Sequence, residues 1–226
     1  MKVDKLYYQI QATIDSKIIG RSELPLSVEI SDKRFLTFRK EYLVDVNKYF
    51  EKSNVYEDFP KDIKAKMYQR KKNPIDLMLV MPMCLGIPFI VSEKIKKILE
   101  NLKVNKSEYH LEKLFIEGSY EAFYFLFIPM LKNSDTINYN KSVFYSASQD
   151  RFAVFGTFEN YLTEKINRFK VKRLFISKKF QNQDIIRLQA AGPFFSERLV
   201  DAFEESNVVG YEIIKGGDFE VNLILE

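Results

Sequence analysis

The sequence predicts an α+β protein in which a mainly antiparallel sheet is packed by a few capped helices. Three observations lead to this prediction. The chain begins with alternating apolar and polar residues, it is rich in Phe (20) and Tyr (13), and a Ser-Glu helix opening occurs twice, at Ser92 and Ser196. Each opening follows a glycine and a proline and precedes apolar residues at helical spacing, so the chain contains a repeated strand-helix-strand unit.

The N-terminal part mixes strands with helix. Apolar residues alternate between Leu6 and Ile14, which is typical of a half-buried strand. A second apolar run occupies Phe35 to Phe38, and apolar residues from Tyr42 to Phe50 fall at helical offsets. We predict an α/β subdomain over residues 1–73, with one continuous domain as the alternative.

A basic run from Lys61 to Lys72 is followed by the dipeptide Asn73-Pro74, which interrupts regular secondary structure. We interpret this run as a solvated linker. It leads into a second domain over residues 74–226. The expected strands and loops of this domain, apart from the two helices, are a strand at 75–81, a hairpin of 109–116 with 121–128, a surface loop at 129–141, strand-like runs within 143–158, a pair of 171–176 with 184–188, and a closing hairpin of 211–214 with 219–225.

The Ser-Glu pairs have a structural interpretation. At a helix N-cap, the hydroxyl of Ser92 or Ser196 accepts a hydrogen bond from an otherwise unpaired helix amide, which contributes about 1 kcal/mol. The carboxylate of Glu93 or Glu197 then faces the positive end of the helix dipole. We therefore expect these residues to be helix-capping scaffold rather than catalytic nucleophiles, because neither serine lies in a Gly-x-Ser-x-Gly frame.

Composition limits the classes of function. One cysteine excludes an intramolecular disulfide, and the absence of a long apolar segment argues against secretion or membrane insertion. We therefore expect a cytoplasmic protein with no membrane partner. The 35 basic and 31 acidic residues give a net charge of +4, which does not suggest a dedicated nucleic-acid binder.

Candidate catalytic residues are few. His110 lies in an apolar strand pattern and Cys84 among apolar neighbours, so both are expected to be structural. The triplets Asp15-Ser16-Lys17 and Asp62-Ile63-Lys64 resemble the acid-x-lysine arrangement of metal-dependent nucleases, which is the enzymatic alternative. No nucleotide fingerprint is present, and no cofactor is expected.

Several short motifs follow one another in a distinctive order. They are Ile75-Asp76-Leu77, the opening Phe89-Ile90-Val91-Ser92-Glu93-Lys94, Ile137-Asn138 with Ser142, the strand Val171 to Ile176, the opening Phe194-Phe195-Ser196-Glu197-Arg198-Leu199, and Gly210-Tyr211. In this order they resemble a family of bacterial immunity proteins from polymorphic toxin systems, over about residues 75–214. Asn138 stands where the family pattern has an aspartate.

The resemblance implies a cytoplasmic protein that binds a cognate protein toxin encoded nearby and neutralises it by occlusion, without catalysis. It identifies neither the toxin nor the oligomeric state. Recognition commonly lies on loops carried by a rigid sheet, so we expect contacts at Asp135, Asn138, Tyr139 and Tyr145. An adaptor domain that binds a partner without inhibiting it is the remaining alternative.

Overall fold

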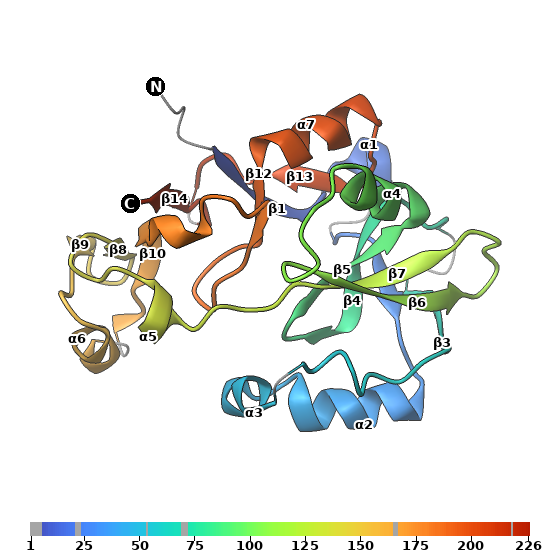
Figure 1. The fold of residues 1–226 in the computed structure, drawn as a ribbon, viewed down its shortest axis with the longest axis horizontal. Helices are drawn as coiled ribbons and strands as arrows, with labels where there is room; N and C mark the ends of the chain where they lie inside the picture. Colours follow the sequence, from blue (N-terminus) through green and yellow to red (C-terminus); the bar gives the residue numbers. More distant parts are fainter. Residues whose placement is uncertain (1–5, 21–23, 53, 69–71, 165–166, 218) are drawn as a thin grey trace. The chain divides into compact units, whose positions relative to one another are not determined.

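The computed structural model describes residues 6–20, 24–52, 54–68, 72–164, 167–217 and 219–226 (Figure 1). The fold is α+β, as predicted, with mostly antiparallel sheets. The chain divides into two compact units. The first comprises the described parts of Met1–Ile10, Met130–Glu197 and Ile213–Glu226, and the second those of Gln11–Pro129 and Arg198–Glu212. Residues 73 and 74, where a domain boundary was predicted, both fall in the second unit.

The second unit contains a closed six-stranded barrel with the strand order β2-β3-β6-β7-β5-β4. The pairs β2/β4 and β3/β6 are parallel, and the remaining neighbours are antiparallel. The strands are β2 (Ser27–Glu29), β3 (Ile63–Met67), β4 (Leu77–Cys84), β5 (Ile87–Ser92), β6 (His110–Ile116) and β7 (Phe123–Phe127). The helices of this unit are α1 (Ser16–Ile19), α2 (Lys33–Tyr42), α3 (Val46–Glu51), α4 (Glu93–Asn101) and most of α7 (Glu197–Glu205).

The barrel interior is filled by alternate residues of its strands, since successive side chains of a strand point to opposite faces. Ile63, Leu114 and Phe123 are buried inside. Helix α2 contributes Phe35, whose ring stacks on Phe125 at 5.6 Å between centroids. Aromatic residues therefore contribute substantially to this core, in agreement with the high Phe content of the sequence.

The first unit contains a four-stranded sheet with the order β14-β10-β8-β9. A second sheet has the strand order β11-β12-β1-β13. The elements are β1 (Tyr7–Ala12), α5 (Asn133–Thr136), β8 (Val143–Ser146), β9 (Arg151–Ala153), α6 (Phe158–Thr163), β10 (Lys170–Ile176), the 3-10 helix η2 (Lys178–Phe180), β11 (Ile185–Ile186), β12 (Phe194–Ser196), β13 (Tyr211–Ile213) and β14 (Asn222–Leu225).

The two predicted Ser-Glu helices are both present and begin in the same way. The hydroxyl of Ser92 donates to the Asp76 carboxylate at 2.7 Å, and the hydroxyl of Ser196 donates to Asp184 at 2.7 Å. In each case the serine backbone N–H also donates to the carbonyl of the same aspartate. Ser92 occupies the N-cap position without a side-chain bond to a helix amide. The predicted capping bond of Ser92 is therefore wrong, because its hydroxyl is used by the carboxylate.

The two helices also end alike. Lys103 and Asn207 follow them with positive φ angles of 52° and 49°. The next residue then turns back, with Val104 N–H donating to Leu99 and Val208 N–H to the carbonyl of Phe203. This is the usual way to satisfy the last carbonyls of a helix. The repeat that was read from the sequence is thus a repeated structural unit.

Several predictions for other elements need correction. The basic run that was interpreted as a linker contains β3, because Ile63, Ala65 and Met67 alternate with lysines and are buried. The predicted surface loop at 129–141 contains α5 and buries Tyr139.

Two predicted hairpins do not form. The strand β10 pairs with β8 and β14, whereas β11 pairs with β12, so the segments 171–176 and 184–188 are not partners. The strands β13 and β14 lie in different sheets, and β14 pairs in parallel with β10. These long-range pairings have no local signal in the sequence.

Candidate protein-binding surface

The four-stranded sheet of the first unit has one face in the core and one face outside it. On β8, Phe144 and Ser146 are buried, whereas the alternate residues Val143 and Tyr145 are half-buried. The core side packs against aromatic residues before and within α6, where Phe144 contacts Phe155 and Tyr161. On the other side of the β8–β9 hairpin, Tyr145 is half-buried and Phe152 is exposed.

A row of side chains crosses this outer face. Tyr145 is opposite Phe152 on β9 and opposite Lys170 on β10. The rings of Tyr145 and Phe152 are 4.8 Å apart, and the Lys170 ammonium lies 4.7 Å above the ring of Phe219. Phe152 and Phe219 expose 67% and 70% of their surface. We call these four residues the aromatic–basic face.

Polar contacts hold Tyr145 in place. Its hydroxyl donates to the Asp150 carboxylate at 2.8 Å, in the turn between β8 and β9. This bond restrains the ring, so less side-chain freedom is lost when a partner binds. Lys170 and its neighbour Arg173 make no ion pair with any described residue. The face thus offers restrained and exposed aromatic rings together with available positive charge.

Such a face is suited to binding another protein. Aromatic residues supply large apolar contact areas and dominate the energy of many interfaces. Cations beside them favour an acidic partner surface and accelerate association. The residues of the aromatic–basic face are therefore suited to non-covalent binding of a partner protein.

The four predicted toxin contacts lie in different environments. Tyr145 is part of the aromatic–basic face, and Asp135 is exposed on α5. The Asn138 amide donates to Glu226 at 2.8 Å and is half-buried, which indicates a structural role. Tyr139 is buried and stacks on Phe144, and burial raises the pKa of its hydroxyl. Tyr139 is therefore not a surface contact, because the hydrophobic core takes its ring.

The side chains with catalytic potential also have structural surroundings. His110 stacks on Tyr56 at 4.6 Å, and burial lowers its pKa. Burial raises the pKa of the Cys84 thiol to about 12, which leaves the thiol protonated at neutral pH. Asp15 caps α1 through a bond from the Lys17 N–H. Among the described residues, no group of three or more His, Cys, Asp or Glu side chains is placed to hold a metal ion.

Sequence reasoning missed three members of the aromatic–basic face, Phe152, Lys170 and Phe219. A weak signal exists for Phe152, because it lies between polar turn residues and Ala153 in a strand-like run. Phe219 has no such signal. It reaches the face because β14 pairs with β10 and thereby brings the preceding residues beside Lys170.

Comparison with protein-family models and with curated proteins gave no match for the chain. Across the described residues, the helices are too short or too polar to cross a lipid bilayer.

Proposed function

We propose that the chain is an immunity protein, which binds a cognate bacterial protein toxin through the aromatic–basic face and blocks the toxin by occlusion. The observation that carries this proposal is the row Phe152, Tyr145, Lys170 and Phe219, which leaves two phenylalanine rings largely in solvent. The order of motifs around the two Ser-Glu helices, which resembles that of bacterial immunity proteins, also supports the proposal. The proposal requires neither catalysis nor a cofactor.

The size of the face suits the anchor of a larger interface. A stable complex buries about 800 Å² on each partner, and a few aromatic residues supply most of its binding energy. The exposed rings of Phe152 and Phe219 are candidates for these anchors. The surrounding polar residues would then form the rim, where charges mainly set the association rate.

The test is co-expression with the toxin-like region of the adjacent gene. We expect the chain to restore growth of the host and to form a stable complex with the toxin. We expect Phe152→Ala combined with Phe219→Ala to weaken the complex by about 30-fold or more, which corresponds to a loss of about 2 kcal/mol. Affinity is measured by calorimetry on the purified proteins.

Tyr120→Ala is the matched control, because Tyr120 is a fully exposed aromatic residue of the second unit. It should leave affinity unchanged. If the chain rescues growth but the double variant binds like the control, the aromatic–basic face is not the contact surface. If a folded chain gives no rescue from a toxic neighbour, the immunity function itself is wrong. A complex without inhibition would favour the adaptor alternative.

A further inference from the structure

The barrel of the second unit carries two adjoining hollows on its outer surface. The first, of about 360 Å³, lies over β3 and β6 and is lined by Lys64, Lys66 and Phe115. The second, of about 470 Å³, is lined by Lys66 and Lys72. Lys66 and Glu117 line both hollows, which therefore adjoin, and we call the two hollows together the depression.

The register of the barrel explains why these side chains meet. Lys64 on β3 is opposite Phe115 on the parallel strand β6. The alternate residues Ile63 and Ala65 point into the barrel and are buried, which turns the lysines outward. Phe115 remains 45% exposed, and the Lys113 ammonium lies 5.1 Å above its ring. The depression therefore combines cations with an exposed aromatic ring.

Two of the three lysines that line the depression have no acidic partner among the described residues. Lys66 lies 3.3 Å from Glu29, in a partly exposed ion pair. Lys64 and Lys72 make no ion pair with a described residue. Glu117 is the acidic side chain that lines the hollows themselves. A ligand that brings carboxylates to Lys64 and Lys72 would supply partners for these two ammonium groups.

We propose that this depression binds an acidic, partly apolar peptide segment of a partner protein. Carboxylates of the segment would pair with Lys64 and Lys72, and an apolar side chain would pack on Phe115. The site shares no residue with the aromatic–basic face, so it does not depend on the proposed immunity function.

A peptide fits this depression better than a nucleic acid does. Single-stranded nucleic acids need a groove that stays positive along the phosphate backbone. Here Glu29 and Glu117 interrupt the row of lysines. A peptide can place its carboxylates selectively and leave neutral groups beside the glutamates. The favoured ligand is therefore acidic at separate positions rather than uniformly charged.

The test uses a labelled peptide of glutamate and leucine, its glutamine counterpart, and a single-stranded oligonucleotide of equal charge. Binding to the full chain is measured by fluorescence anisotropy at low and physiological salt. We expect saturable binding of the acidic peptide, weakened by salt, and weaker binding of both other probes. Lys64→Gln with Lys72→Gln should lower the affinity about tenfold, as expected for the loss of two charge contacts. Glu117→Gln should raise the affinity by removing repulsion.

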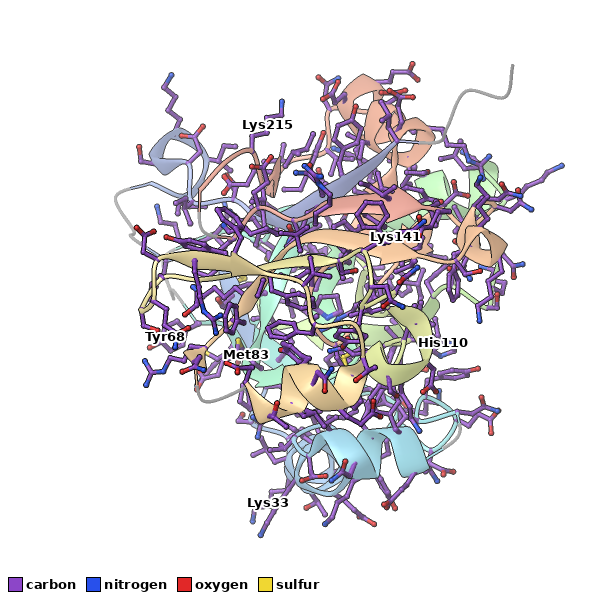
Figure 2. All side chains as sticks on the ribbon, turned by 90° about the vertical axis from the view of Figure 1, so that its left-hand side faces the viewer. Lys33, Tyr68, Met83, His110, Lys141 and Lys215 are labelled. Carbon is purple, nitrogen blue, oxygen red and sulfur yellow. The ribbon has the colours of Figure 1, made fainter. Side chains whose placement is uncertain are left out.

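Lys33→Gln is the matched control, because Lys33 is an exposed lysine on α2 that does not line these hollows (Figure 2). Circular dichroism verifies that every variant is folded. The proposal is overturned if the acidic peptide does not bind, if the oligonucleotide binds more tightly, or if the double variant and the control bind alike. A decrease with the double variant and an increase with Glu117→Gln would together support it.

Discussion

Replacing each repeated serine with alanine tests how much the two Ser-Asp pairs stabilise the fold. The pairs have the same oxygen–oxygen distance of 2.7 Å but different surroundings. Ser196 and Asp184 are both almost fully buried, with exposures of 0% and 1%. Asp76 is more accessible, and it also accepts bonds from the Lys94 ammonium and from a backbone N–H. Removing the serine hydroxyl therefore has unequal consequences.

The magnitudes follow from how accessible each carboxylate is to water. A hydrogen bond to a charged group stabilises a protein by about 1.5–3 kcal/mol. We expect Ser196→Ala to lower the free energy of unfolding by about 2–3 kcal/mol, because the buried Asp184 carboxylate cannot replace the bond with water. Ser92→Ala should cost about 1 kcal/mol, since Asp76 keeps Lys94 and gains water more easily. Ser134→Ala, at an exposed serine, should stay within about 0.5 kcal/mol.

Urea unfolding followed by circular dichroism and tyrosine fluorescence gives these free energies, because the chain has 13 Tyr and no Trp. Since the chain has two compact units, unfolding is also followed locally by hydrogen exchange at the amides of α4 and α7. Equal losses for Ser92→Ala and Ser196→Ala, or a larger loss at Ser92, would refute the argument that burial of the carboxylate sets the cost.

Further predictions concern a half-buried imidazole, a thiol and a glycine. The lowered pKa of His110 means that acid favours the unfolded chain, so stability should fall as the pH drops below about 6.5, and His110→Gln should reduce this loss in urea titrations at several pH values. Cys84 should resist a thiol-reactive dye at pH 8 until urea is added; rapid labelling of the native chain would contradict its burial. At Gly210, φ is +108° and an added Cβ would lie 2.4 Å from the Leu77 carbonyl oxygen. Gly210→Ala should therefore lower the free energy of unfolding by more than about 2 kcal/mol, against about 1 kcal/mol for Gly216→Ala, where nothing obstructs a Cβ. Equal melting temperatures of the two variants would contradict the clash.

Local patterns of the sequence predicted the elements that depend on local interactions. The alternation around Tyr8 gave β1, and the apolar spacing after Ser92 and Ser196 gave α4 and α7. The strand β3 was missed because its three buried residues lie between lysines, and the charge suggested a linker. In so short a segment, the alternation of apolar residues is a weaker indication of a strand than the lysine content is of a linker.

The barrel could not be predicted in the same way. Its closure depends on parallel pairs such as Ile63 with Leu114, which lie far apart in the sequence. The aromatic–basic face has the same difficulty, because Phe219 comes from a distant segment. Tyr145 was named because loops on a sheet commonly carry recognition residues, and the structure places it, half-buried, on β8. Tyr139 was misplaced, because composition does not distinguish an exposed tyrosine from one stacked in the core.

The order in which the chain visits its two units has a kinetic consequence. The first unit needs three separate segments, and its strand β14 pairs with β10 through contacts such as Asn222 with Arg173. The second unit likewise combines the long segment Gln11–Pro129 with Arg198–Glu212. The conformational entropy of closing such loops is lost before the long-range contacts form, which slows folding. Unpaired strand edges are therefore exposed for longer. We therefore expect strand pairing to limit the rate of refolding, and helices α4 and α7 to form earlier. Fragments made by a single cut in the chain should not reproduce either unit.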